Sequence, residues 1–396
     1  MLTRREVLHG TGATLALGAA FSAMPALAQT RPLRIGVLIA EADHDGQEQM
    51  VEPYVSQMRL GLELAASEIN AAGGILGRPI ELVYANDGGS PAPGAAAAHD
   101  MVIEGGCEVL ISGFITAIRS FLARQFADHD GPAVPVFHAF GTEGNFCNAN
   151  ITHTGPTSAQ SLRPMTEWLG DRTSARPFTI SDWSPSQRAV SAYLYGNTGI
   201  LTGAALVTTP VQGNYPGQFR GVMQWADEME SETIYVSVPR PYAVNVANHA
   251  IDAGVAEGKT FAFLDFSEWH AAQLQPGADV VTCLPFVASD PAPAVQDFVG
   301  RANAMPMAGG LVTHVAFTHY NSLMALKAAM ERSGEATGPA AIAGLRGLSL
   351  ETATGMLAFD ESGYATMTMH VARATPGALD IVHTAEAVPA AATCRV

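Results

Sequence analysis

The stretch "AASEINAAGGILGRPIELVYANDGGSP", residues 65–91, changes backbone character three times within a few turns. An amphipathic helix runs into Gly73-Gly74 and stops there, because glycine is the residue that most often ends a helix. After Gly77-Arg78-Pro79 an extended apolar run begins, and it ends in the turn residues Asn86-Asp87-Gly88-Gly89. A helix, a tight junction and a strand in this order predict one crossover of an α/β fold.

The same alternation of short apolar runs, turns and helix-length amphipathic stretches continues on both sides of this crossover. Near-continuous apolar strands that are joined by helices are typical of a doubly wound parallel sheet. In the first part of the chain we predict strands at 33–40, 80–87, 107–113 and 133–140, and helices at 57–73, 93–105 and 118–129.

The alternation begins again at residue 178, so the chain contains two similar α/β units. The predicted fold class is therefore α/β, with two lobes that are each built on a doubly wound parallel sheet. The second series has strands at 178–183, 204–211, 233–239, 260–266 and 278–287, helices at 187–197, 219–229, 245–254, 294–303 and 314–332, a hairpin at 355–372 and a short last strand at 378–384.

The first residues have the form of an export signal. Arg4-Arg5 precedes the apolar residues 13–23, and Ala26-Leu27-Ala28 is a cleavage site of the small-x-small kind. We expect residues 1–28 to be removed and the mature protein to be periplasmic. The residues around the arginines resemble the twin-arginine signal, and a general secretory signal is the alternative. We expect no transmembrane helix, since no later apolar run reaches the roughly 20 residues that one needs.

The charge of the chain excludes some classes of partner. Residues 1–28 hold two of the 21 basic and one of the 37 acidic residues, so the mature chain has 19 and 36 and a net charge of about −17. Such a surface repels nucleic acid and anionic membranes. The net negative charge does not exclude an anionic ligand that binds in a locally positive site.

Motifs for catalysis, metals and cofactors are absent from the sequence, and we expect neither a metal nor a cofactor. It contains no G-x-S-x-G, S-x-x-K, H-E-x-x-H or Walker motif. The cysteines Cys107, Cys147, Cys283 and Cys394 lie far apart without a C-x-x-C pair. We interpret Cys107 and Cys283 as core residues and leave the disulfide pairing open.

Candidate ligand-binding residues follow the predicted strands, because open α/β sheets bind ligands at the carboxyl ends of their strands. Thr116 comes just before a predicted helix, where a hydroxyl and backbone N–H groups can hold a carboxylate or carbonyl oxygen. Aromatic residues suit a stacking wall, and Arg240 suits a bidentate contact to a carboxylate or amide oxygen. The candidates are Phe114, Thr116, His138 and Phe140 in the first unit and Trp183, Arg240, Tyr242, Asp265 and Phe266 in the second.

Each candidate also has a purely structural interpretation. Thr116 could be only a helix cap, and His138 and Phe140 could be packed loop residues. Trp183 could be an aromatic contact between the lobes, and Arg240 could be a surface charge.

Several segments together resemble one family, the type I periplasmic solute-binding proteins of ABC transporters, in the group that binds branched-chain amino acids, urea or short-chain amides. The opening stretch is similar to the helix, Gly-Gly turn and second strand of that group. Further similarity lies in "FGTEGNFCNANITHTGPTSAQSLRPMTEWL" (140–169), "FLDFSEWHAAQL" (263–274) and "FTHYNSLMALKAAMERSG" (317–334).

The resemblance implies two lobes, joined by three crossings near 154–156, 287–289 and 349–354, that close on a ligand by a hinge motion. It implies a receptor that binds a small polar solute, such as an amide, a urea-like compound or an amino acid, and delivers it to a membrane permease. The alternatives are a ligand sensor that regulates amide metabolism and an exported enzyme. A monomer is expected, with lobe 1 at 31–155 plus 289–350, lobe 2 at 156–288 plus 351–385, and a tail at 386–396.

Overall fold

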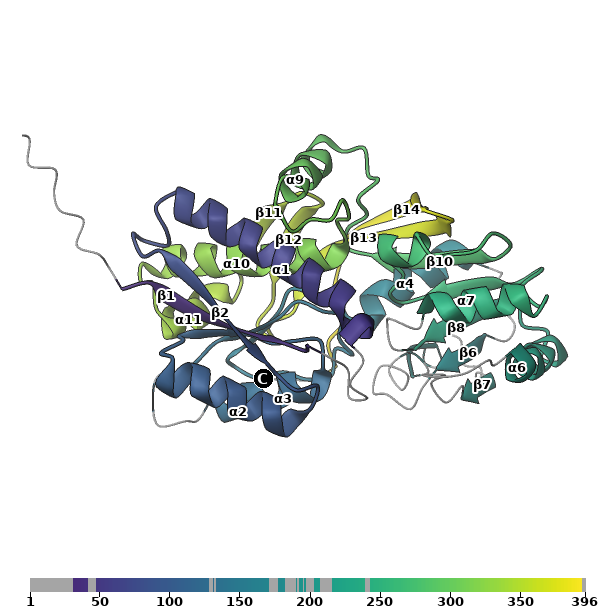
Figure 1. The fold of residues 1–396 in the computed structure, drawn as a ribbon, viewed down its shortest axis with the longest axis horizontal. Helices are drawn as coiled ribbons and strands as arrows, with labels where there is room; N and C mark the ends of the chain where they lie inside the picture. Colours follow the sequence, from purple (N-terminus) through teal and green to yellow (C-terminus); the bar gives the residue numbers. More distant parts are fainter. Residues whose placement is uncertain are drawn as a thin grey trace, which may run out of the picture.

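The protein is described by a computed structural model. Its elements form two lobes that lie side by side along the long axis of the molecule (Figure 1). We define lobe 1 by the sheet that contains the first strands, and lobe 2 by the sheet that contains the later ones. The structure describes residues 31–41, 48–127, 131, 133–170, 177–181, 190, 192–194, 196, 203–206, 216–238 and 243–393. The predicted signal peptide, residues 1–28, lies outside these ranges.

Lobe 1 contains a parallel sheet with the strand order β2-β1-β3-β4-β5. Every neighbouring pair in it runs in the same direction. The interior strand β1 is buried at almost every position, as expected for a strand that helices cover on both faces. The strands are β1 (Leu33–Ile39), β2 (Ile80–Asn86), β3 (Val109–Ile111), β4 (Val136–His138) and β5 (Ile151–His153).

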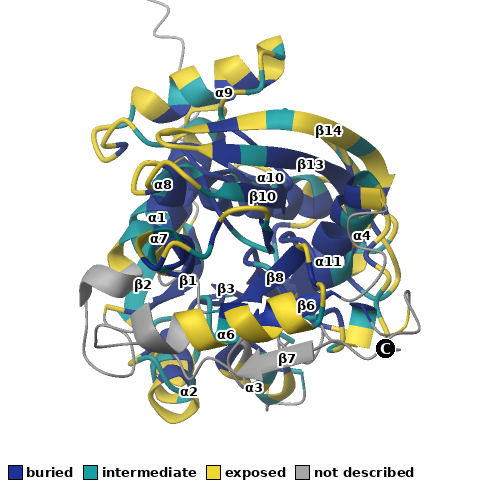
Figure 2. Cartoon of the chain, turned by 90° about the vertical axis from the view of Figure 1, so that its right-hand side faces the viewer, coloured by how far each residue is buried: buried dark blue, intermediate teal, exposed yellow. Residues whose placement is uncertain are grey.

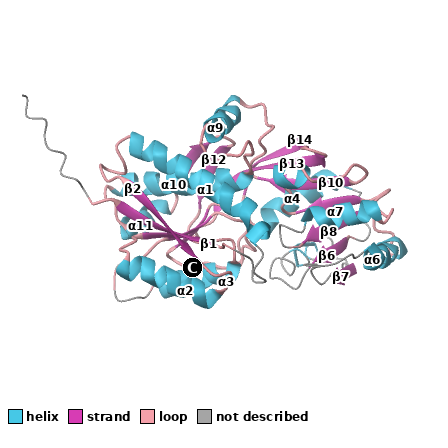
Figure 3. Ribbon diagram, viewed as in Figure 1, coloured by secondary structure: helices cyan, strands magenta, loops and turns pink. Residues whose placement is uncertain are grey.

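Helices cover both faces of this sheet. On one face α1 lies along α10, and on the other face α2 lies beside α3 (Figures 1 and 3). A separate apolar core fills the space on each face. The helices of this lobe are α1 (Glu48–Ala71), α2 (Pro91–His99), the π-helical turn η1 (Asp100–Glu104), α3 (Thr116–Gln125), α9 (Pro293–Asn303), α10 (His314–Ser333) and α11 (Gly338–Leu345).

Lobe 2 contains a mixed sheet with the order β11-β12-β13-β10-β9-β8-β6-β7, and β14 pairs with β13. The strands from β10 to β7 are parallel, whereas β11 to β14 pair antiparallel. The outer faces of β14 and α6 are largely exposed (Figure 2). The strands are β6 (Phe178–Ser181), β7 (Gly203–Leu206), β8 (Thr233–Ser237), β9 (Thr260–Phe263), β10 (Asp279–Leu284), β11 (Ser349–Thr352), β12 (Gly355–Phe359), β13 (Ala365–Thr375) and β14 (Ala378–Val388), and the helices are α4 (Ser158–Leu169), α6 (Pro216–Glu228), α7 (Ala243–Asp252) and α8 (Glu268–Ala271).

The predicted fold class is confirmed, and most predicted elements are present with shifted bounds. The junction at 73–79 is a tight turn in which Gly73, Gly74 and Gly77 all have positive φ. A Cβ on Gly74 would lie 2.1 Å from the Arg78 carbonyl oxygen, so only glycine fits there. The helix expected at 57–73 begins nine residues earlier, at Glu48.

Two predicted elements have different forms in the structure. The helix expected at 93–105 is α2 followed by the π-helical turn, in which the Gly105 N–H donates to the Asp100 carbonyl oxygen at 2.8 Å. The last strand, expected to be short, extends over 11 residues because it pairs along β13. Five elements, β5, α4, α8, α11 and β11, were not predicted, and most of the helix expected at 187–197 lies outside the described residues.

The cysteines divide into two kinds. Cys107 and Cys283 are free and buried, which confirms their interpretation as core residues. Cys147 is disulfide-bonded. Cys394 lies outside the described residues. Among the residues that the structure describes, every helix is too short or too polar to span a bilayer.

The contact between α1 and α10 depends on Gly61. A Cβ on Gly61 would lie 2.0 Å from the Ala316 carbonyl oxygen, so the two helix backbones touch at this point. We predict that Gly61→Ala lowers the free energy of unfolding by about 1–3 kcal/mol, because the helices must separate. The control Gly300→Ala lies on α9 with open space around its Cβ and should raise stability by about 0.5–1 kcal/mol. Urea unfolding of both variants measures the difference, and equal effects would contradict the close helix contact.

Candidate ligand-binding site

The carboxyl edge of the lobe 1 sheet carries a cluster of rings. Phe114 follows β3, and His138 and Phe140 lie at the end of β4, so the parallel pairing of these strands brings all three together. The Phe140 ring lies 6.0 Å from Phe114 and 6.2 Å from His138, measured between centroids. His319 of α10 completes the cluster at 4.7 Å from Phe140. The structure thus joins three predicted site residues and adds one that was not predicted.

The members of this cluster differ in exposure. His138 and His319 are fully buried and Phe140 is 2% exposed, whereas Phe114 is only partly buried. The His138 Nδ1 atom lies 2.9 Å from the Ser112 hydroxyl, and the His319 Nδ1 atom lies 2.7 Å from the Val315 carbonyl oxygen. The His319 ring therefore donates its Nδ1–H along its own helix. The buried rings form a fixed wall against which the more accessible Phe114 packs.

Thr116 has a different position from the one predicted. It is the first residue of α3, and Ile115 occupies the N-cap without a side-chain cap. The sequence suggested that Thr116 precedes a helix at 118–129, and this is wrong because the helix begins two residues earlier, at Thr116 itself. Thr116 thus lies in the first turn of α3, where the Ile118 and Arg119 backbone N–H groups donate to the Ile115 carbonyl oxygen.

In lobe 2, Asp265 and Phe266 follow β9 and lead into α8. Phe266 is fully buried and stacks on His270, with ring centroids 5.0 Å apart. Phe266 therefore supports His270 from within the lobe 2 core. The other lobe 2 candidates, Trp183, Arg240 and Tyr242, lie outside the described residues.

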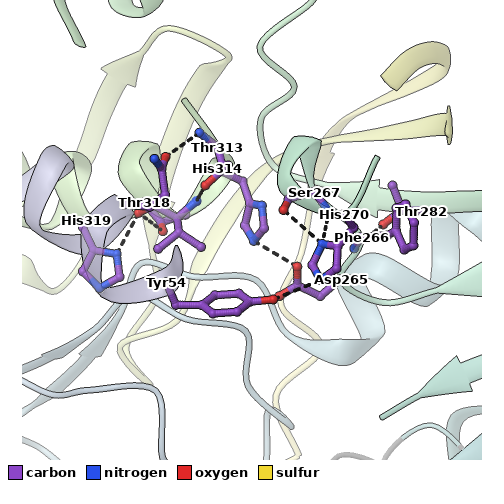
Figure 4. Close-up of polar contacts among 12 residues, drawn as sticks. Tyr54, Asp265, Phe266, Ser267, His270, Thr282, Thr313, His314, Thr318 and His319 are labelled. Carbon is purple, nitrogen blue, oxygen red and sulfur yellow. Dashed lines mark hydrogen bonds and ion pairs between the residues drawn. The ribbon is translucent and has the colours of Figure 1, made fainter. Parts of the chain in front are cut away.

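Two pairs of side chains meet between the lobes. The Tyr54 hydroxyl on α1 lies 3.0 Å from the His270 Nε2 atom on α8. The His314 Nε2 atom on α10 lies 3.4 Å from an Asp265 carboxylate oxygen. Figure 4 shows both pairs, with Tyr54 and His314 pointing from lobe 1 toward the segment that follows β9. Asp265, predicted from its place after a strand, thus faces the other lobe directly.

The hydrogen-bond network fixes the direction of the Tyr54–His270 contact. The Ser267 backbone N–H donates to His270 Nδ1 at 2.9 Å, so Nδ1 carries no proton in the neutral ring. The proton of the neutral ring is then on Nε2, which donates to the Tyr54 oxygen. The Tyr54 oxygen therefore accepts this hydrogen bond, and its hydroxyl proton points away from His270.

Glu268 connects this region to a predicted crossing. One of its carboxylate oxygens accepts the Ala288 backbone N–H at 2.8 Å, and Ala288 lies in the crossing expected at 287–289. Burial raises the pKa of Glu268, while the Ala288 N–H and His314 act in the opposite direction. Asp265, Glu268 and His314 therefore form one electrostatically linked group at the boundary of the lobes.

Sequence reasoning missed Tyr54, His270, His314 and His319. The strand-tip rule cannot find them, because they lie on helices. A local signal existed only for His270, since Ser267 and His270 have the spacing of a helix capping pair. Within the described residues, no group of three His, Cys, Asp or Glu side chains is placed to hold a metal ion.

Two α/β lobes, in which polar side chains of one lobe face the segment after a strand of the other, define a two-lobed ligand-binding protein. The family model for periplasmic binding proteins matches residues 34–378. The chain belongs to this family, which is one of binding proteins rather than enzymes, and it has the type I fold.

Solved structures with the same fold are solute-binding proteins of ABC transporters. A protein from Rhodopseudomonas palustris BisB5 in complex with 3,4-dihydroxybenzoic acid has a TM-score of 0.73 at 16% identity, covering 91% of this chain and 99% of that one. The leucine-, isoleucine-, valine-, threonine- and alanine-binding protein from Brucella ovis, in its closed conformation, has a TM-score of 0.75 at 14% identity, covering 90% and 96%. A substrate-binding protein from Sphaerobacter thermophilus has a TM-score of 0.76 at 15% identity, covering 90% and 98%.

We predict that the Tyr54–His270 hydrogen bond couples the two lobes energetically. Tyr54→Phe removes only the hydroxyl, and His270→Asn can keep an acceptor for Ser267 while it loses the reach to Tyr54. Each change should lower the free energy of unfolding by about 0.5–1.5 kcal/mol. The double variant should lower it by less than the sum of the two single effects, and the difference, the coupling energy, should be about 1 kcal/mol. Urea unfolding of the four proteins measures this cycle. Strict additivity would show that the contact does not couple the lobes.

A buried histidine beside the first predicted crossing should make stability depend on pH. His153 is fully buried and stacks on Tyr364, with ring centroids 4.0 Å apart. Burial, together with the positive charge of Arg119, lowers the pKa of His153 well below its ordinary value. The unfolded chain therefore binds a proton below about pH 6.5 that the folded protein does not bind, so stability falls as the pH falls.

We predict that His153→Phe, which keeps a ring against Tyr364, flattens this pH dependence. Between about pH 6.5 and pH 5 the slope of unfolding free energy against pH should decrease by up to about 1.4 kcal/mol per pH unit. The control His383→Asn replaces an exposed histidine of β14 and should keep the parent slope. Denaturant unfolding at several pH values gives the slopes, and an unchanged slope in His153→Phe would contradict the assignment.

Proposed function

We propose that this protein is the extracytoplasmic solute-binding receptor of an ABC importer. It captures a small polar solute between its lobes and presents the closed form to a membrane permease. The observation that carries this proposal is the direct meeting of lobe 1 side chains with the segment after β9, through the Tyr54–His270 and His314–Asp265 pairs. A solute that bridges these groups stabilises the closed form, because it adds contacts that only the closed form can make.

The same reasoning supports a hinge formed by the three predicted crossings. The chain passes between the lobes near 154–156, 287–289 and 349–354, with lobe 1 at 31–155 plus 289–350 and lobe 2 at 156–288 plus 351–385. The two polar pairs between the lobes support this motion, since hydrogen bonds exchange with water at a low net cost. We propose a periplasmic monomer, exported by the signal at residues 1–28.

The chemistry of the described contacts limits the solute. Tyr54 can donate a hydrogen bond and Asp265 can accept one, so a compound that carries both an acceptor oxygen and N–H groups fits them. Amides, urea-like compounds and amino acids have this combination. The similar structures are described as carrying dihydroxybenzoic acid or as binding branched-chain and small amino acids, so benzoates belong in the test. The family match favours a receptor over the regulator of amide metabolism.

Thermal unfolding of the mature chain, residues 29–396, against a panel of amides, urea, amino acids and benzoates tests this proposal. A solute at a hundredfold its Kd should add about 2.7 kcal/mol of stability and raise the unfolding midpoint. Asp265→Asn should remove most of this shift. The control Asp380→Asn, on the exposed face of β14, should retain it. The proposal would be contradicted if no solute of the panel raised the unfolding midpoint, or if the protein chemically converted the solute that it binds.

A further inference from the structure

The end of the chain returns from lobe 2 to lobe 1. The last strand, β14, pairs with β13 and so belongs to the lobe 2 sheet. Beyond it, the Thr393 backbone N–H donates to the Gly144 carbonyl oxygen at 2.9 Å. Gly144 follows β4, which belongs to the lobe 1 sheet. We call residues 389–393 the strap.

The strap is fastened to the first predicted crossing by side chains. The Thr157 hydroxyl donates to the Ala390 carbonyl oxygen at 2.7 Å. The Gln160 amide donates to the carbonyl oxygens of Val388, at 2.8 Å, and of Ala365, at 2.9 Å. Gln160 is only 1% exposed, and Val388 and Ala390 are buried as well. The start of α4, the start of β13 and the strap therefore meet in one buried hydrogen-bonded node.

A disulfide lies at the lobe 1 end of the strap. Cys147 is disulfide-bonded, and it follows Gly144 by three residues. Cys107 and Cys283 are free thiols. The sequence contains four cysteines, and the remaining one, Cys394, comes directly after Thr393. The hydrogen bond from Thr393 to Gly144 brings the described end of the strap to the segment that carries Cys147.

The length of the strap limits how far the lobes can separate while both of its ends stay attached. Five residues span at most about 17 Å when they are fully extended. Ala391 has a φ of 50°, so the backbone bends within the strap and its present span is shorter than this limit, and Ala387, near the end of β14, has a φ of 49°. Left-handed backbone at alanine is unfavourable without support, and the node around Thr157 and Gln160 supplies that support.

We propose that Cys147 is bonded to Cys394 and that this disulfide anchors the strap as a fourth connection between the lobes, which restrains their opening. This inference rests on the proposed hinge motion. With the disulfide intact, the strap holds the open form closer to the closed form. When a dithiol reduces the bond, it gives up two electrons and two protons and becomes a disulfide itself. The protein then carries two thiols, and the strap is held only by hydrogen bonds.

The pairing is tested first by proteolysis of the unreduced full mature chain, with free thiols blocked, followed by mass spectrometry. We expect one cross-linked product that contains both Cys147 and Cys394. Alkylated Cys394 in the unreduced protein would overturn the pairing.

The restraint is tested by small-angle X-ray scattering without any solute, on the parent protein and on Cys147→Ser, each with and without dithiothreitol. We expect the reduced parent protein and the variant to share a larger radius of gyration than the oxidised parent protein. Dithiothreitol should not change the variant, which controls for other effects of the reductant. If Cys147→Ser fails to fold, the reduced parent protein gives the same comparison. Equal radii in the oxidised and reduced parent protein would overturn the restraint.

This test is separate from the test of the receptor role. A redox change in the radius without any bound solute in the panel would support the strap and contradict the receptor. Solute binding with an unchanged radius would support the receptor and contradict the strap. Where a solute is found, its apparent Kd should become weaker on reduction, since a smaller fraction of the protein is then close to the binding-competent form.

Discussion

The parallel pairing of β1 with β2 on one side and β3 on the other is the constraint on which lobe 1 depends. Parallel strands need a crossover, and helices return the chain to the starting edge after β1, β2 and β3, whereas a loop joins β4 to β5. All strands therefore end at one edge, and the loops of that edge carry the ring cluster. Gly36 on β1 shows how tightly the layers fit, since a Cβ there would lie 2.8 Å from Leu110 and 2.9 Å from Met101.

This constraint explains what the sequence could and could not predict. The strands β1 and β2 were placed within one residue, because buried parallel strands have near-continuous apolar runs. Phe114, His138 and Phe140 were placed together because they share one sheet edge. β5 has only three residues, too few for a pattern, and α4 contains a proline. Tyr54 and His270 are 216 residues apart and in different lobes, so no local pattern could join them.

Polar pairs meet at the boundary between the lobes, beside a buried apolar cluster that continues from lobe 1 into lobe 2. Contacts such as Tyr54–His270 have modest net energies, because water can replace each partner when the lobes separate. Two other apolar clusters each lie within a single lobe and fill its interior, where they keep the sheets rigid while the connections bend.

The close contact between α1 and α10 also governs when the protein can fold during its synthesis. The partner that covers α1 lies more than 240 residues later in the sequence, and lobe 2 similarly needs β13 and β14 from the end of the chain. Neither lobe can complete its core until nearly the whole polypeptide has left the ribosome. Such long-range pairing slows folding and leaves apolar surface uncovered in the meantime. The nascent chain therefore depends on protection from aggregation until its last strand has been made.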